Sequence, residues 1–362
     1  MEYINNILGS QSQTQLVEEA IPTLCNRLQH ATMISDRRSA VLGLKSFSRQ
    51  YRETVVEYGL KPLISTLKKD YDNANIVKSI LETFLILFIR GGTNEDLTRG
   101  WISQQLRLQN GKYPSPLLME DVTLDQMSLW IADALLQDEE ALKLLVGELA
   151  ETDYHLRLYT IQLLESLVAS RGSRIKEALL NIPTAISVIC NLLADIHEPV
   201  RNEAILLLMA VVNNNFNIQK LVAFENTFET LFNIIDEEGG IRGSILVQDC
   251  LTLITNLLQF NASNQKFFLE TQCVPRLARL LGEPVDETEE LNNVDEKGVP
   301  ITPSSIVWTE QRLQNMVIAL EICRLLVSDD NELVVQNQDN LYQNGIHYIC
   351  LLYTSDAADD MQ

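Results

Sequence analysis

The chain has 362 residues and a formal net charge of −21 at pH 7, from 49 Asp and Glu against 28 Lys and Arg. This length exceeds that of one ordinary compact core, so it favours two domains or an extended array of repeats. The acidic balance argues against a nucleic-acid binder, because phosphate contacts need a basic surface.

The first helical patterns contain an unusually basic stretch, residues 35–69, with eight Lys and Arg against three acidic residues. One hypothesis is a partner-facing ridge, formed by Arg37, Arg38, Lys45, Arg49 and Arg52. The more ordinary interpretation is a solvated helix face with local ion pairs, each of which contributes little to stability.

Two stretches interrupt the helical patterns. Residues 91–127 are too long for a simple turn, and Trp101 within them favours a binding loop that packs. Residues 282–307 carry seven acidic residues and three prolines, a composition that predicts a mobile acidic loop.

The chain repeats itself with a shift of 46 residues, which places Gln219-Lys220 on Gln265-Lys266. A related unit lies 44 residues earlier, where Arg157 corresponds to Arg201. Units of about 40 to 47 residues with two or three helices each indicate an all-α, armadillo- or HEAT-like α-solenoid.

The run from Ala204 to Val212 has no polar side chain, so we expect an interior helix, with Pro199 in its first turn and residues 213–215 ending it.

No pattern of catalytic or ligand-binding residues appears. The four histidines lack metal-ligand spacing, the glycines of "EEGGIRGS" lack the Lys-Ser or Lys-Thr of a phosphate loop, and no G-x-S-x-G motif is present. The six cysteines form no C-x-x-C pair and fit a reduced core, and no apolar run has the length of a membrane span or leader. We expect a soluble, non-enzymatic, cytosolic protein without a cofactor or metal.

Residues 350–362 break the helical pattern and are interpreted as a non-native tail, which leaves residues 1–349 as the N-terminal part of a longer armadillo-like head. Importin-type peptide binding is not expected, because no Asn follows Trp101, Trp130 or Trp308 at the fourth position.

The chain closely resembles the globular head of the Uso-type general vesicular transport factors over roughly residues 15–345. Segments that carry the resemblance include "ISDRRSAVLGLKSFSRQYRE" (34–53), "DLTRGWISQQLRLQNGKYPSPL" (96–117), "HEPVRNEAILLLMAVVN" (197–213) and "QKLVAFENTFETLF" (219–232). The resemblance implies a vesicle tether of ER-to-Golgi and intra-Golgi transport, located in the cytoplasm and peripheral to Golgi and vesicle membranes. It also implies a Rab-family GTPase, SNARE proteins and other Golgi tethering factors as partners before membrane fusion. The full-length protein would be a homodimer through a C-terminal coiled coil, which this sequence lacks.

Two head regions of that family are associated with partner binding, and they correspond here to residues 35–63 and 197–247. The candidate partner-binding residues are Arg37, Arg38, Arg49, Arg52, Trp101, Glu225, Asn226 and Arg242. The alternative function is an armadillo adaptor that binds extended peptides of cargo or signalling proteins. Rows of amide or aromatic side chains at inner positions such as Asn233 and Arg279 would favour the adaptor, and irregular rows the tether.

Overall fold

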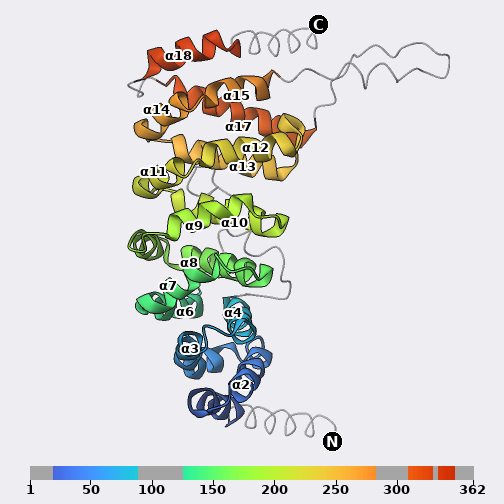
Figure 1. Ribbon diagram of the computed structural model, residues 1–362, viewed down its shortest axis with the longest axis vertical. Coiled ribbons are helices and arrows are strands. Elements are labelled where there is room, and N and C mark those ends of the chain that lie inside the picture. The colour runs from blue at the N-terminus through green and yellow to red at the C-terminus, as the bar shows by residue number, and fades with distance from the viewer. Residues whose placement is uncertain (1–18, 89–124, 283–308, 329–332, 347–362) are drawn as a thin grey trace, which may run out of the picture. The chain divides into compact units, whose positions relative to one another are not determined.

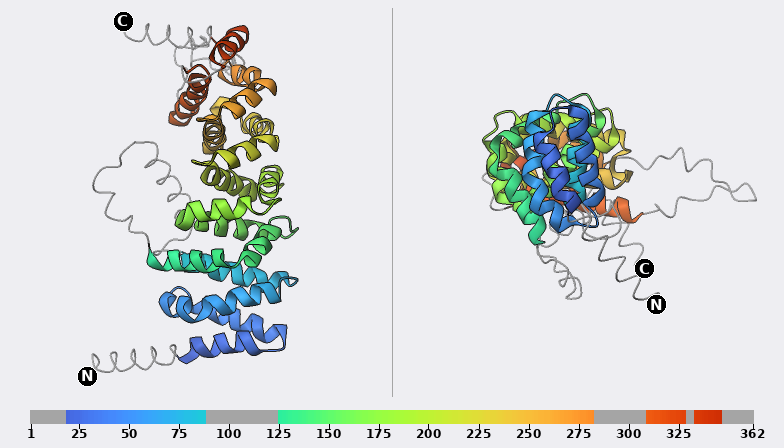
Figure 2. Two further views of the ribbon diagram at one scale, coloured as in Figure 1. Left: turned by 90° about the vertical axis from the view of Figure 1, so that its left-hand side faces the viewer. Right: turned by 90° about the horizontal axis from the view of Figure 1, so that it is seen from below.

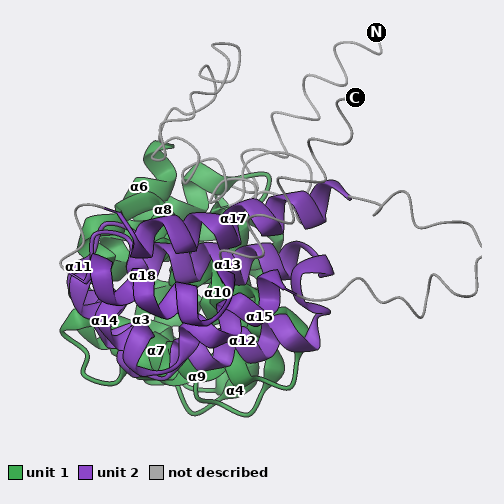
Figure 3. Ribbon diagram, turned by 90° about the horizontal axis from the view of Figure 1, so that it is seen from above, with its two compact units in different colours: residues 1–211 green, residues 212–362 purple. Residues whose placement is uncertain are grey.

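The computed structural model describes residues 19–88, 125–282, 309–328 and 333–346, and all regular elements in these ranges are helical. The chain divides into two compact units, residues 1–211 and 212–362 (Figure 3). The predicted all-α class is confirmed. Trp101, the acidic loop after Gly282 and the tail from residue 350 lie outside the described residues.

The first unit begins with helical residues 19–30 and stacks its helices in chain order (Figures 1 and 2). Its elements are α2 (Ile34–Phe47), α3 (Arg52–Lys69), α4 (Ala74–Phe88), α6 (Gln126–Gln137), α7 (Glu139–Glu148), α8 (Tyr154–Leu180), α9 (Ala185–Asn191), the 3-10 turn η2 (Leu192–Ala194) and α10 (Glu198–Val212). Within α8 the backbone at Arg171 is not helical (φ −138°, ψ 52°), so this long helix is kinked.

The second unit repeats a short helix, a second short helix and a longer helix. Its elements are α11 (Phe216–Phe224), α12 (Thr227–Glu237), the 3-10 turn η3 (Gly240–Arg242), α13 (Ile245–Leu258), α14 (Ala262–Glu270), α15 (Cys273–Leu281), α17 (Glu310–Leu326) and α18 (Val334–Gln343). Helix α11 packs on α14 and α13 packs on α17, so equivalent helices are neighbours in successive repeats (Figure 1).

Helix starts follow from capping residues in the sequence. Asp125, Asp138 and Asp153 precede α6, α7 and α8, and each carboxylate accepts hydrogen bonds from backbone N–H groups of the first turn. Asn215 and Asn261 do the same for α11 and α14. Each cap satisfies N–H groups that have no partner inside the helix, which fixes where the helix begins.

The shift of 46 residues recurs in the backbone of the second unit. Asn214 and Phe260 have φ of 52° and 54°, and Asn226 and Gln272 have φ of 59° and 60°. Both pairs are 46 residues apart, and each places a left-handed residue in the same turn of its repeat. The predicted repeat is therefore confirmed in its turns as well as in its apolar positions.

The apolar run in α10 is interior, as expected. Eight of its nine side chains from Ala204 to Val212 are at most 4% exposed, and Ala210 is half-buried. Pro199 lies in the first turn and the helix ends at Val212. The five described cysteines are buried as thiols and are not joined in disulfides, which fits the predicted reduced core.

Candidate partner-binding surfaces

Arg37 is not on the surface. The residue is 3% exposed, and its side chain donates from Nε and Nη2 to the two carboxylate oxygens of Asp70, both at 2.6 Å. Its Nη1 group donates to the carbonyls of Ala31 and Thr32 at 2.8 and 2.9 Å. The prediction that Arg37 faces a partner is wrong, because its buried guanidinium joins α2 to the end of α3.

Three other basic side chains of residues 35–69 also connect helices. Lys45 pairs with Glu82 of α4 at 2.6 Å, and Lys68 pairs with Asp138 at 2.7 Å. Arg52 donates to Asp125 at 2.5 Å, to Ser128 at 3.1 Å and to the carbonyl of Leu87 at 2.5 Å. The interpretation as a solvated face with local ion pairs therefore does not hold for these residues, because their partly buried partners lie 37 to 73 residues away.

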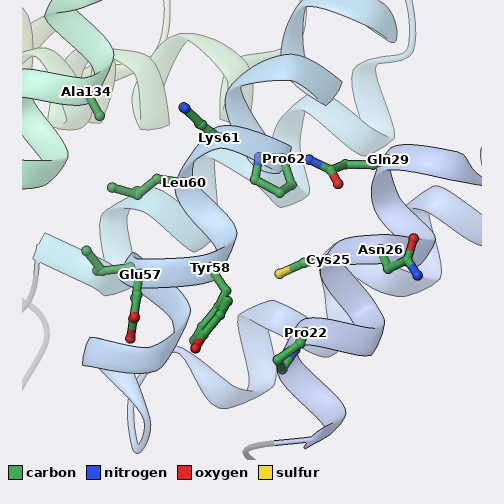
Figure 4. Close-up of a pocket in the computed structure, with 11 residues that line it drawn as sticks. Pro22, Cys25, Asn26, Gln29, Glu57, Tyr58, Leu60, Lys61, Pro62 and Ala134 are labelled. Carbon is green, nitrogen blue, oxygen red and sulfur yellow. The ribbon is translucent and has the colours of Figure 1, made fainter.

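Arg38 and Arg49 are exposed, so they remain as surface candidates from the predicted ridge. A shallow groove of about 600 Å³ lies in the same unit, between helical residues 19–30 and α3 (Figure 4). Pro22, Cys25 and Tyr58 line it together with Lys61. Burial raises the pKa of the Cys25 thiol to about 11, so this thiol stays protonated and is a poor nucleophile.

The candidates of the second unit lie on two separate turns. Glu225 and Asn226 are exposed in the turn between α11 and α12, where Asn226 Nδ2 donates to Glu229 at 2.7 Å. Arg242 is exposed in η3. The structure thus places all three on the surface, with Glu225 and Asn226 adjacent.

Side chains of α12 and α15, among them the expected inner positions Asn233 and Arg279, form a charged network. Arg276 donates to Asn233 at 2.9 Å and to Asp236 at 2.5 Å, and Arg279 pairs with the same Asp236 oxygen at 3.1 Å. The guanidinium of Arg276 also lies 5.2 Å from the ring centroid of Phe232. Asn233 and Arg279 are therefore not members of an amide or aromatic row, which was the feature expected of a peptide adaptor.

Three phenylalanines of the second unit that the sequence did not mark as candidates are exposed. Phe216 and Phe224 of α11 are 54% and 64% exposed, and Phe260 is 79% exposed. Phenylalanines in a helical pattern are normally assigned to the core, so composition alone gave no signal. The repeat does contain a signal that Phe260 is exposed, because Phe260 occupies the position of a polar residue, Asn214, one repeat earlier.

Potential metal ligands are not clustered in the described ranges. No group of three or more His, Cys, Asp or Glu side chains could hold a metal ion in that part of the chain. Glu148 of α7 is 2% exposed, and burial, followed by repulsion from Glu151 and Asp153, raises its pKa to about 7. No single described helix has the length and hydropathy of a membrane span. Helix α8 and the segment Ala185–Ala194 reach these values only as a pair, and the two are bent by 106° relative to each other.

Comparisons with known proteins give a consistent assignment, although no protein-family model matches the chain. The intracellular protein transport protein USO1 of Saccharomyces cerevisiae is 53% identical over 353 residues, which are 97% of this chain and 19% of that protein. The general vesicular transport factor p115 of Bos taurus is 32% identical over 333 residues, 91% of this chain and 31% of that protein. The chain therefore spans less than a third of the length of these relatives.

Solved structures agree on the fold. The crystal structure of Uso1-2 aligns with a TM-score of 0.81 at 54% identity, over 93% of this chain and 47% of that one. A designed armadillo repeat protein aligns with a TM-score of 0.53 at 16% identity, over 83% of this chain and 99% of that one. The second likeness concerns the fold alone, and it confirms the predicted armadillo-like α-solenoid.

Proposed function

We propose that this chain, which belongs to the Uso1-type family of vesicular transport factors, is the partner-binding head of a vesicle tether that acts in ER-to-Golgi and intra-Golgi transport. The observation that carries the proposal is the 53% identity to a protein named for intracellular protein transport over 97% of this chain. The relatives are named as transport factors, which supports a head that acts by binding.

The proposed partners are a Rab-family GTPase, SNARE proteins and other Golgi tethering factors, and the association with membranes is peripheral, from the cytoplasmic side. Binding would require exposed side chains on a rigid scaffold, and Arg38, Arg49, Glu225, Asn226 and Arg242 meet this requirement. The ion pairs of Lys45 and Arg52 hold α2, which carries Arg38, and α3, which follows the turn that contains Arg49. Homodimerisation belongs to the full-length protein.

A binding assay with a panel of GTP-loaded Rab proteins tests the proposal. We expect wild type to retain one Rab in its GTP form, and Arg38→Glu with Arg49→Glu to weaken that binding without a change in thermal unfolding. The matched control is Arg27→Glu with Lys143→Glu, which reverses two exposed charges of the same unit outside residues 35–69. Equal binding by both double variants would contradict a role of Arg38 and Arg49 in Rab binding. Failure of the wild-type chain to bind any Rab would contradict the proposal of a Rab GTPase as a partner.

The peptide-adaptor alternative is disfavoured by the inner positions of the second unit. Asn233 accepts a hydrogen bond from Arg276, and Arg279 pairs with Asp236, so both side chains are engaged within the unit. An extended peptide would have to displace these contacts before its backbone could be bound.

A further inference from the structure

In the second unit three exposed apolar side chains lie on α11, and a fourth lies in the turn before α14, the short helix that begins the next repeat. The two helices are parallel, because the Gln219 carbonyl accepts a hydrogen bond from Asn264 at 3.0 Å and the ring of Phe224 lies 5.2 Å from that of Phe267. The exposed residues are Phe216, Leu221, Phe224 and Phe260, and with half-buried Phe267 they are called here the phenylalanine strip.

Phe224 is exposed but held in place. Its ring contacts Phe267, whose centroid lies 6.4 Å from that of Phe228, and Phe228 in turn packs edge-on against Phe268 at 5.1 Å. Phe228 and Phe268 are fully buried. An exposed ring fixed on a buried aromatic row loses little conformational freedom on binding, which is typical of the anchor residues of protein interfaces.

Phe260 provides a second and independent observation. Its φ of 54° lies in the left-handed region, where a bulky side chain is rarely found, and Asn214 adopts the same conformation one repeat earlier with a residue type that tolerates it. Phe260 is 79% exposed, so burial in the core does not offset this backbone cost. Residues in strained backbone conformations cluster at active sites, ligand clamps and switch regions.

The charges around the strip indicate what could cover it. Helices α11 and α14 end on the same side, and the negative end of each helix dipole meets exposed Glu225 and Glu270, with Glu229 nearby. Lys220 and Lys266 lie one turn back, and Lys266 is paired with Glu270 at 3.8 Å. A chain of net charge −21 with an acidic end at this strip disfavours an anionic membrane and favours a protein segment that carries cations.

We propose that the phenylalanine strip docks an amphipathic helix of a partner protein, with apolar side chains at i, i+4 and i+7 on the strip and Lys or Arg residues toward Glu225 and Glu270. The nine residues of α11 extend about 14 Å, which matches between two and three turns of a docked helix. The inference rests on the strip alone, so it stands or falls separately from the proposed tethering function.

The test uses the full chain and a labelled synthetic helix of about 18 residues, with Leu at i, i+4, i+7 and i+11 and Lys elsewhere on its surface. We expect Phe224→Ala to weaken binding roughly tenfold in fluorescence anisotropy, as for an interface anchor. A scrambled peptide of the same composition, and one with Glu in place of Lys, should each bind much more weakly than the original. The matched control is Tyr342→Ala in α18, an aromatic residue of the same unit that is also 64% exposed.

Phe260→Asn separates docking from folding. Asn tolerates the left-handed backbone, so this variant should unfold at the same temperature as wild type or higher, while its affinity for the helix falls. Wild-type affinity in both Phe variants, or equal affinity for the scrambled peptide, would overturn the proposal. Cosedimentation with phosphatidylcholine vesicles, with and without phosphatidylserine, should be negligible. Vesicle binding that Phe224→Ala abolishes would overturn the proposal, because it would show that the strip binds a membrane and not a protein helix.

Discussion

Arg37 in the first turn of α2 forms a two-pronged ion pair with Asp70, the residue that follows the last turn of α3. A similar pair recurs later in the first unit, where Arg157 in the first turn of α8 contacts Asp195 after η2, with Nε to Oδ2 at 2.7 Å. Both pairs are largely buried, with side-chain exposures of at most 10%. Each fixes the start of one helix against the end of another, so the pairs help to set how successive helices stack.

We expect Arg37→Ala to lower the free energy of unfolding by about 3 to 5 kcal/mol, because it leaves the carboxylate of Asp70 buried without its partner. Arg38→Ala is the matched control, since Arg38 is adjacent and exposed, and it should change stability by no more than about 0.5 kcal/mol. Denaturant unfolding of both variants measures the difference. Equal stability of the two would contradict the interior role of Arg37.

The double variant Arg37→Met with Asp70→Leu is expected to be more stable than Arg37→Ala. It removes both charges together, so neither is left buried without a counter-charge, and the desolvation cost of the pair disappears. The same denaturant experiment, extended to the single variants Arg37→Met and Asp70→Leu, gives a coupling energy between the two positions. A double variant as unstable as the sum of the two single variants would show that each side chain acts independently.

Leu208→Asp should abolish cooperative unfolding or lower stability by more than about 4 kcal/mol, since Leu208 is fully buried and the new carboxylate would have no partner. Circular dichroism during thermal unfolding measures this effect. Leu42→Asp is the control, because Leu42 of α2 is 44% exposed and a carboxylate there remains hydrated. A wild-type transition in the Leu208 variant would contradict the interior assignment of α10.

The fold could be predicted from the sequence because its determinants are local and recur. Apolar positions and the capping residues Asn215 and Asn261 are 46 residues apart, and the same helices and turns follow from each copy. The apolar run of α10 has no polar side chain on any face of the helix, so the sequence alone implied that this run is buried.

The candidate site could be predicted only in part, because exposure depends on packing between distant residues. Arg37 and Arg38 are neighbours of the same type, yet Arg37 meets Asp70, which lies 33 residues later. Sequence periodicity in α2 does not identify that partner. Phe224 is the converse case, an apolar residue that is exposed. Its short helix α11 has apolar residues on two faces, and the sequence does not show which of these faces lacks a neighbour.

Stability should fall as pH rises from about 5 to 7 through Glu148, whose pKa is raised from 4.5 to about 7 by burial and by Glu151 and Asp153. In that range the folded chain keeps a proton on Glu148 that the unfolded chain has released, and the full shift corresponds to roughly 3 kcal/mol. Glu148→Gln should therefore be more stable than wild type at pH 8 and should show a flatter dependence on pH. Glu139→Gln, an exposed change on the same helix, should keep the wild-type slope. Denaturant unfolding at several pH values gives these slopes, and a slope of the Glu148→Gln variant equal to that of wild type would mean that Glu148 is ionised in the folded chain.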